Sequence, residues 1–239
     1  KPKRRDGARA RSERGGWMLP FAVALPSAMR YLILRHGQTD HNRDGVIQGS
    51  SDTSRLTDKG VAQAQHLGSS LVQLTDLAIA RTFISPLTRA QQTFRVLQES
   101  CELPDPTTLN DLREIDLHSW EGREKAQLQR ECPATWSAWL SDPVAMEVDG
   151  RKPIVDLWSR AQSCAWPAVR SDDGGATLLV CHGSLGQALL CTALGLDVSA
   201  WRTHEIPNCG LVEVEWPFEA PRATRWRWRL PDEGDWLTE

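Results

Sequence analysis

Residues 31–49 read YLILRHGQTDHNRDGVIQG, and this stretch determines how the rest of the chain can fold. Residues 31–34 form a short apolar run bounded by polar residues, a pattern typical of a buried parallel strand. The run leads into Arg35-His36-Gly37, at the strand end where open α/β sheets bind their ligands. An imidazole beside a permanently charged guanidinium suits attack on a phosphoryl group, although a charged turn would use the same residue types.

A second buried strand is predicted at residues 176–181, and it also ends in a His-Gly pair, His182-Gly183. A histidine at either place alone would usually be a core residue. Two strands of one sheet that both end this way bring two imidazoles to one edge, which favours a functional site. A helix with an apolar side follows from Ser184.

The segment between these strands contains a helix after Thr57, a strand at residues 79–84 and a helix from Leu87. The apolar stripe of this last helix leaves Arg89 off the buried side, near the helix N-terminus. There the guanidinium and the helix N–H groups could share one anion, and the alternative is a solvated arginine. Residues 123–170 are predicted to be helical in pieces that break at prolines, with tryptophans that pack the core or a lid rather than bind a cofactor.

The C-terminal part alternates apolar and charged residues at 211–216 and 224–230, which predicts an antiparallel hairpin. Valine and tryptophan are expected to face the core, and glutamate and arginine to face solvent. An RNA-binding ribbon of Arg and Trp is the alternative, and the opposing glutamates argue against it. Together these elements predict a single α/β domain over residues 30–239, with a mostly parallel central sheet flanked by helices.

The positive charge of the chain is concentrated in its first residues. Residues 1–14 carry a net charge of +5, whereas the whole chain of 239 residues carries −3, which leaves −8 for residues 15–239. A basic start followed by a short apolar stretch is typical of a targeting segment, and a disordered extension over residues 1–29 is the alternative. No stretch is apolar and long enough to span a membrane, and cations without interleaved aromatic residues make a poor nucleic-acid arm.

The six cysteines are scattered without CxxC or metal-ligand spacing. Two of them, Cys181 and Cys191, lie in apolar runs, where a free thiol behaves as a small hydrophobic group. The pattern predicts a soluble protein in an intracellular, reducing compartment, without structural disulfides or zinc, although a redox-sensitive pair among the other cysteines stays open. We therefore expect neither a metal nor a cofactor.

The candidate site consists of Arg35, His36, Asn42, Arg89, Glu114 and His182. Cationic and donor groups around one imidazole make a pocket for an anion of the size of phosphate within an otherwise acidic domain. A carboxyl group nearby can give its proton to a leaving alkoxide. Since no metal-ligand spacing is present, the cations have to stabilise the charge that a metal would stabilise elsewhere.

Four segments resemble, in order, the motifs of the histidine phosphatase (phosphoglycerate mutase-like) superfamily. They are LILRHGQTDHN, SPLTRAQQT, LREIDLHSWEG and LLVCHGS, within a match that covers roughly residues 30–216. The resemblance implies a mostly parallel sheet flanked by helices, with a helical excursion over the active site at residues 115–160. It also implies a metal-independent phosphatase that forms a phosphohistidine intermediate.

The same resemblance implies a role for each site residue. His36 matches the phosphorylated histidine and Glu114 the proton donor, with His182 as a further catalytic residue. The residues that match phosphate-binding positions are Arg35, Asn42, Gln48, Arg89, His182 and Gly183. The implied partner is a small phosphorylated substrate, with no nucleic acid and no membrane.

The segments LREIDL and VDGRKPIVDLWSRAQSC resemble more narrowly the plant and algal 2-carboxy-D-arabinitol-1-phosphatases. This resemblance implies a sugar phosphate substrate and a chloroplast location, which fits a targeting segment; without such a segment the cytoplasm is expected. Residues 118–122, HSWEG, also resemble the FGxWEG pattern of sugar- and ribazole-phosphatases. The physiological substrate and the oligomeric state stay open.

Two other functions are alternatives. A mutase must hold a second phosphate, and the family does so with basic residues after the glutamate. Here Asp116 and Glu121 follow Glu114, and basic residues come only at Arg123 and Lys125, which favours water over a second dianion. A protein that binds phosphorylated ligands without turnover would lack the nucleophile, an arginine or the acid, and all of these are present.

Overall fold

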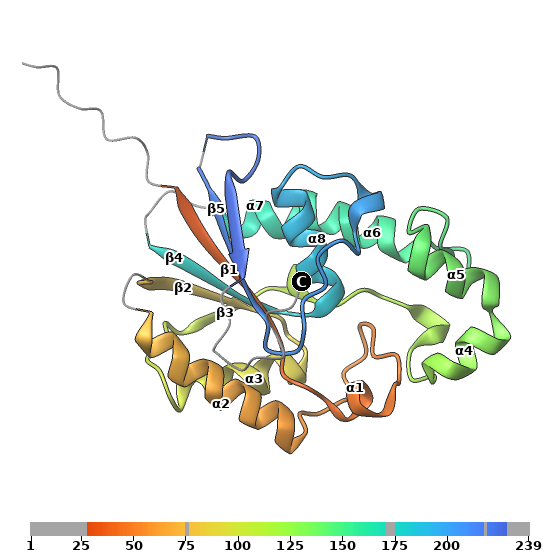
Figure 1. Cartoon of the computed structure of the whole chain (residues 1–239), viewed down its shortest axis with the longest axis horizontal. Coiled ribbons are helices and arrows are strands. Elements are labelled where there is room, and N and C mark those ends of the chain that lie inside the picture. Colours follow the sequence, from red (N-terminus) through yellow and green to blue (C-terminus); the bar gives the residue numbers. More distant parts are fainter. Residues whose placement is uncertain (1–27, 75–76, 171–174, 218, 229–239) are drawn as a thin grey trace, which may run out of the picture.

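A six-stranded mixed sheet forms the centre of the protein in the computed structural model, which describes residues 28–74, 77–170, 175–217 and 219–228 (Figure 1). The strands are, in sheet order, β3 (Pro106–Thr108), β2 (Ile79–Ile84), β4 (Ala176–Cys181), β1 (Met29–Arg35), β5 (Leu211–Trp216) and β6 (Arg225–Trp228). The first four of these run parallel, and the last two form an antiparallel hairpin beside β1. The prediction of a mostly parallel sheet with a C-terminal hairpin is confirmed.

The two central strands, β1 and β4, explain the apolar runs in the sequence. Every residue of β4 is buried, as expected of a strand that is covered on both faces. The strands pair in parallel with Leu34 opposite Val180 and Arg35 opposite Cys181. This register carries the next residue of each strand, a histidine in both, to the same edge of the sheet.

Helices cover both faces of the sheet (Figure 1). On one face α2 (Asp58–Gln73) and α3 (Thr88–Gln98) pack against inward side chains such as Leu32 and Val180. The Thr57 side chain caps α2 by accepting a hydrogen bond from the Gly60 N–H, as its sequence position predicts. The elements of the other face are α6 (Pro153–Arg160), the π-helical turn η3 (Ala161–Ala165), α7 (Trp166–Val169) and α8 (Gly183–Ala193).

The predicted helical excursion, residues 115–160, follows η1 (Asn110–Leu112) and ends with α6. Its other elements are short: η2 (His118–Trp120), α4 (Lys125–Glu131) and α5 (Pro133–Ser141). Proline stands in the first turn of α5 and of α6, where its missing N–H breaks no helical hydrogen bond. Trp120 packs against Trp136 and Trp139, with ring centroids 6.1 and 5.8 Å away, so the tryptophans do form a packed cluster. Two further short elements are α1 (Asp40–Asp44) and η4 (Val198–Ala200).

One glutamate of the hairpin departs from the prediction. Alternation places Glu213 on the solvent face of the hairpin, but its side chain is completely buried. Arg30 of β1 and Arg227 of β6 donate to its two carboxylate oxygens at 2.6 and 2.7 Å. Because β5 lies between these two strands, paired arginines from both sides make burial of the charge tolerable. Val212 and Val214 face the core as predicted.

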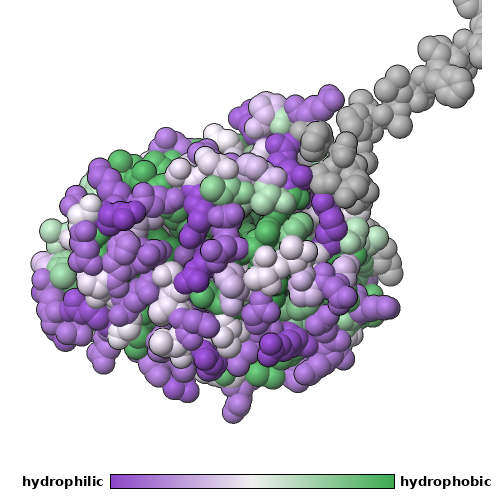
Figure 2. Space-filling view, turned by 180° about the vertical axis from the view of Figure 1, so that it is seen from behind, coloured by the Kyte–Doolittle hydropathy of each residue, from purple (hydrophilic) through white to green (hydrophobic). Residues whose placement is uncertain are grey.

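The outer surface is largely hydrophilic on the face shown in Figure 2, with hydrophobic side chains in scattered areas. No helix within the described ranges is both long and apolar enough to cross a membrane. Cys181 and Cys191 are buried, in line with their apolar surroundings. Residues 1–27 of the predicted extension lie outside the described part of the chain. Met29, which the prediction placed in the extension, is the first residue of β1.

Candidate active site

The two His-Gly pairs meet at the carboxyl edge of the sheet. The rings of His36 and His182 lie 5.2 Å apart between centroids, at an interplanar angle of 61°. Arg35 ends β1, Arg89 lies in the first turn of α3, and Glu114 follows η1. Residues that are far apart in the sequence therefore gather around one pair of imidazoles.

His36 is held in one tautomer by its own backbone neighbour. Its Nδ1 lies 2.7 Å from the carbonyl oxygen of Gly37, which can only accept, so Nδ1 carries the proton and Nε2 keeps its lone pair. The Gly37 N–H donates to Thr93 Oγ1 at 3.0 Å. No side chain fits at position 37, because a Cβ there would lie 2.5 Å from the carbonyl oxygen of Gly60. The backbone thus orients the imidazole and leaves Nε2 free to react.

Both imidazoles are neutral at physiological pH. Burial lowers the pKa of His36 well below its usual value, and the charges of Arg89 and Arg35 lower it further. Burial likewise lowers the pKa of His182, and Arg89 and His36 add to the effect. A neutral imidazole is the form that can act as a nucleophile.

These buried histidines predict that acid destabilises the fold. In the unfolded chain each histidine binds a proton near pH 6.5, whereas in the folded protein each stays neutral to a lower pH. Below about pH 6.5 the unfolded state binds more protons, so the free energy of unfolding falls as the pH drops toward the folded pKa values. We expect each histidine to contribute a slope of about 1.4 kcal/mol per pH unit in this window, measured by urea unfolding.

The contribution of one site can be isolated by substitution. His36→Gln should remove about half of this slope, while His66→Gln, at an exposed position on α2, should show no such loss. Equal slopes in wild type and His36→Gln would show that His36 titrates normally in the folded protein.

Arg35 is anchored at one end of its guanidinium only. Its Nη1 donates to the carbonyl oxygen of Ile206 at 2.6 Å, whereas its buried Nε has no partner among the described residues. Gly183 lets the guanidinium lie against the start of α8, because a Cβ at that position would come within 3.2 Å of it. Burial lowers the pKa of Arg35, and the nearby Glu114 carboxylate opposes this effect. An unpaired donor beside a helix N-terminus is suited to an anionic ligand.

The burial of Arg89 differs from the prediction made from the apolar stripe of α3, which left Arg89 off the buried side. Its position off the apolar stripe does not expose it, since its side chain is completely buried. Nη1 and Nη2 donate to the carbonyl oxygens of Ser51 and Gly49 at 2.8 and 2.7 Å, and Nε donates to His182 Nδ1 at 3.2 Å. Burial lowers the pKa of Arg89 to about 10, so it stays charged at neutral pH. Arg89 is therefore a fixed positive charge beside the imidazoles.

His182 uses both ring nitrogens within the protein. Since Nδ1 accepts from Arg89, Nε2 carries the proton and donates to Ser85 Oγ at 2.7 Å. Ser85 directly follows β2, so the ends of three parallel strands meet here. To bind a phosphate oxygen directly, His182 has to exchange Ser85 for the ligand.

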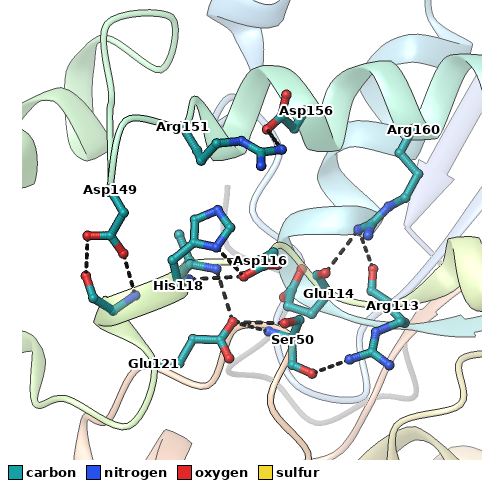
Figure 3. A network of polar contacts seen from close by, with 12 residues as sticks. Ser50, Arg113, Glu114, Asp116, His118, Glu121, Asp149, Arg151, Asp156 and Arg160 are labelled. Carbon is teal, nitrogen blue, oxygen red and sulfur yellow. Dashed lines mark hydrogen bonds and ion pairs between the residues drawn. The ribbon is translucent and has the colours of Figure 1, made fainter.

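Glu114 fastens the excursion to the start of α8. Its Oε1 accepts from the backbone N–H groups of Ile115 and Leu185 at 2.9 and 3.0 Å, and its Oε2 accepts from the Ser184 N–H at 3.0 Å. Arg160 donates to the backbone carbonyl of Glu114 at 3.0 Å (Figure 3). A carboxylate bound by N–H groups at a helix N-terminus also benefits from the helix dipole.

Asn42 and Gln48 present their amide NH₂ groups. The side-chain oxygen of Asn42 accepts from the Thr39 backbone N–H and from Asn208, and that of Gln48 accepts from the hydroxyl groups of Thr39 and Ser54. With the oxygens engaged, the NH₂ groups are the ends left to donate to a ligand. The structure thus places both residues in the network that surrounds His36.

Sequence reasoning missed three residues that hold the site together: Ser85, Thr93 and Asn208. The Asn208 amide donates to the carbonyl oxygen of His36 and to Asn42 Oδ1, both at 3.1 Å. Its position could have been predicted, because a strand antiparallel to β1 begins at the edge where β1 ends, and Asn208 lies just before β5. Ser85 carries a signal of the same kind, because it directly follows the parallel strand β2, whereas Thr93 carries none.

The two acidic residues that follow Glu114 differ in their surroundings. Glu121 Oε1 accepts from the N–H groups of Ser50 and Leu117 at 2.7 and 3.0 Å, which ties the loop next to Arg89 to the excursion. The carboxylate of Asp116 is mostly exposed and lies 3.1 Å from His118 Nδ1. Of the two residues, Asp116 is exposed and Glu121 is half-buried.

The fold and the site together define a class of protein. It is an α/β protein whose parallel strands bring two neutral histidines and the half-buried Arg35 to one edge, where the buried Arg89 of α3 joins them, in a site fit to hold a phosphoryl group. Within the described ranges no His, Cys, Asp and Glu side chains are grouped so that they could hold a metal ion.

The chain belongs to the histidine phosphatase superfamily (branch 1), which it matches over residues 31–229. The family predicted from the four motifs is confirmed. Among relatives, a 2-carboxy-D-arabinitol-1-phosphatase from Triticum aestivum is 39% identical over 80% of this chain and 38% of its own length. A probable 2-carboxy-D-arabinitol-1-phosphatase from Arabidopsis thaliana is 36% identical over 93% of this chain and 45% of its own length. The chain therefore spans less than half of the length of these plant relatives.

Bacterial relatives and solved structures agree with this assignment. A probable phosphoglycerate mutase GpmB from Proteus mirabilis is 32% identical over 83% of this chain and 90% of its own length. The structure of a mycobacterial glucosyl-3-phosphoglycerate phosphatase with VO3 is 28% identical, with a TM-score of 0.70 over 85% of this chain and 98% of that one. An α-ribazole phosphatase from Shigella flexneri, 23% identical with a TM-score of 0.70 over 88% of this chain and 100% of that one, shares the fold.

Proposed function

We propose that this protein is a metal-independent phosphomonoesterase that hydrolyses a small phosphorylated sugar or sugar acid through a phosphohistidine at His36. The observation that carries the proposal is the hydrogen bond from His36 Nδ1 to the Gly37 carbonyl, which leaves Nε2 as the nucleophile. The guanidinium groups of Arg35 and Arg89 supply the positive charge that a transferring phosphoryl group requires.

The reaction proceeds in two displacements. In the first, His36 Nε2 bonds to phosphorus while the bond from phosphorus to the sugar oxygen breaks, and Glu114 gives a proton to that oxygen. In the second, water attacks the phosphohistidine, Glu114 takes up a proton from the water, and phosphate and free His36 are restored.

The remaining site residues bind the phosphoryl oxygens. Arg35 and Arg89 provide charge, and the NH₂ groups of Asn42 and Gln48 provide neutral donors. His182 holds the Arg89 guanidinium in place and turns its Nε2–H from Ser85 to the phosphate. Gly183 opens the N-terminus of α8, whose dipole favours an anion.

The names of the relatives support a phosphorylated sugar derivative as the substrate. Two plant relatives are named for 2-carboxy-D-arabinitol 1-phosphate, and the mycobacterial structure is named for glucosyl-3-phosphoglycerate. We infer that the histidine phosphatase domain begins with β1 at Met29, one residue before the predicted boundary, and that the residues before it form an extension. A chloroplast location follows if residues 1–29 direct a fused fluorescent protein to that organelle, and a cytoplasmic one if they do not.

Phosphoryl transfer of the phosphoglycerate mutase type is the second candidate, because the Proteus mirabilis relative carries that name. It requires a second phosphate beside Glu114, and the open carboxylate of Asp116 repels one there. Incubation with 3-phosphoglycerate distinguishes the two activities. A phosphatase releases inorganic phosphate, whereas a mutase accumulates 2-phosphoglycerate.

A trapping experiment tests the proposed function. Rapid acid-free quenching of the protein with ³²P-labelled substrate should give a covalent label that is stable to base and lost in acid, as expected of a phosphohistidine. Peptide mapping should place the label at residue 36. A phosphoserine, or a label that withstands acid, would contradict the proposal.

Metal removal should have no effect on the rate. The cations of the proposed mechanism are arginines, so hydrolysis of p-nitrophenyl phosphate should be the same before and after dialysis against EDTA. A large loss of activity that Mg²⁺ or Zn²⁺ restores would show that a metal takes part.

A further inference from the structure

A small polar cavity borders the segment that carries Glu114. Its volume is about 180 Å³, and its charged or titratable lining residues are Asp116, His118, Arg151, Asp156 and Arg160. Figure 3 shows these side chains around one space beside the backbone of Glu114. The proposed hydrolysis gives none of them a task.

Glu114 connects this cavity to the active site. Its carboxylate accepts from the Ser184 N–H at the start of α8, two residues after His182, while its carbonyl oxygen accepts from Arg160 in the cavity wall. In an in-line displacement the leaving group departs on the side opposite the nucleophile, where the acid protonates it. A leaving group that receives its proton from Glu114 therefore lies beside the residue whose backbone contacts the cavity wall.

Both arginines of the cavity retain unused donors. Arg160 Nη2 donates to the carbonyl oxygens of Arg113 and Glu114 at 2.7 and 3.0 Å, but its buried Nε has no partner among the described residues. Arg151 makes a long 3.5 Å contact with Asp156, and 63% of its side chain is exposed. Guanidinium groups of this kind bind carboxylates through paired N–H donors.

The rim of the cavity is held in a strained conformation. His118 has a φ of 50°, a left-handed conformation that residues other than glycine rarely adopt. The next residue, Ser119, donates from its N–H and its hydroxyl to the two carboxylate oxygens of Asp149 at 3.0 and 2.8 Å. Asp149 belongs to the tight turn that ends at Arg151. The bonds between Ser119 and Asp149 therefore hold the segment of His118 next to the turn that carries Arg151. Backbone strain that the surroundings maintain is frequent at ligand sites.

The charges of the cavity define what can bind there. A simple anion would meet Asp116 and Asp156 as well as the arginines. A neutral polyol would offer no charged acceptor to the unpaired Nε of Arg160 or to Arg151, whose one contact with Asp156 is long. A molecule with both a carboxylate and hydroxyl groups satisfies all of them, because the carboxylate accepts from the arginines and the hydroxyls donate to the aspartates.

We propose that this cavity binds the carboxylate-bearing part of a phosphorylated polyhydroxy acid, so that the enzyme selects sugar acid phosphates over neutral sugar phosphates. The inference rests on the proposed function and names the substrate class of the same site. Arg151 and Arg160 are the residues that determine this specificity.

Pairs of substrates that differ only in the carboxylate test the proposal. One pair is 6-phosphogluconate and sorbitol 6-phosphate, and the other is 2-carboxyarabinitol 1-phosphate and arabinitol 1-phosphate. We expect wild-type protein to have a higher kcat/KM for the acid in at least one pair. Arg151→Ala should lower this preference by roughly 10- to 100-fold, mainly through KM, the size expected for a lost charge-assisted hydrogen bond.

Two variants and one reporter substrate make the outcome decisive. Arg151→Lys keeps the charge and should recover part of the preference, and Arg130→Ala, at an exposed position of α4 outside the cavity, should keep all of it. The proposal would be overturned if wild type had the same kcat/KM for the acid and the neutral member of both pairs. It would also be overturned if Arg151→Ala lowered kcat/KM equally for acid and neutral substrates. If wild type hydrolyses p-nitrophenyl phosphate but shows no preference for the acid substrates, only the proposed role of the cavity is refuted. If it hydrolyses no phosphomonoester, the proposed function is refuted as well.

Discussion

The substitution His36→Ala should lower kcat for every phosphomonoester by a factor on the order of 10⁵ to 10⁶, the usual result of removing a covalent nucleophile. No other group in the site can take its place at this rate. His182, whose ring lies 5.2 Å from that of His36, has both nitrogens engaged by Arg89 and Ser85. Single-turnover hydrolysis of p-nitrophenyl phosphate, together with loss of the ³²P label, measures the effect.

Phosphate binding should survive this substitution, because the two guanidinium groups remain. The dissociation constant of inorganic phosphate should therefore stay within a few-fold of the wild-type value, and the fold should gain stability at acidic pH. His66→Ala, on the exposed side of α2, is the matched control and should retain full activity. Turnover in His36→Ala with a label on His182 would show that the roles of the two histidines are reversed.

The substitution Glu114→Gln should lower kcat by roughly 10² to 10⁴ with little change in KM, which is the usual contribution of a positioned general acid. The loss should be large for a sugar phosphate, whose alkoxide needs a proton as it leaves. It should be much smaller for p-nitrophenyl phosphate, because the phenolate leaves readily without one. The ratio of the two losses is the quantity to measure.

The hydrogen bonds of Glu114 make a second measurement necessary. Its two oxygens accept from three backbone N–H groups, and glutamine would present an NH₂ group to one of these donors. Glu114→Gln should therefore also lower the melting temperature. If both substrates slowed equally while stability fell, Glu114 would be a structural anchor, and Asp116→Asn would be the next variant to test for loss of the proton donor.

The positions of the two histidines were predictable from local sequence alone. A strand that is covered on both faces is largely apolar along its whole length. Residues 31–34 and 176–181 can therefore be recognised as buried strands without any knowledge of the segments that pack against them. Parallel strands of one sheet end at the same edge, and this rule alone brings His36 and His182 together. The start of α2 was predictable for the same reason, because the Thr57 cap acts within its own helix turn.

The surroundings of individual charges were not predictable in this way. Helical spacing shows that Arg89 lies off the apolar stripe of α3, but not that the carbonyl groups of Gly49 and Ser51 cover it. Alternation along β5 likewise assigns Glu213 to one face, while Arg30 and Arg227 on neighbouring strands decide that this position is buried. In each case the burial of the charge depends on residues from another segment.

The chemistry of the site depends on such contacts throughout. Asn208 reaches the backbone of His36 across 172 residues of sequence, and Arg89 reaches His182 across 93. These bonds are 3.1 and 3.2 Å long, and a hydrogen bond weakens steeply when its distance or angle departs from such values. Residue types and spacing therefore identify the groups that can bind and transfer phosphate, whereas the donor, the acceptor and the proton at each nitrogen follow only from the folded arrangement of distant segments.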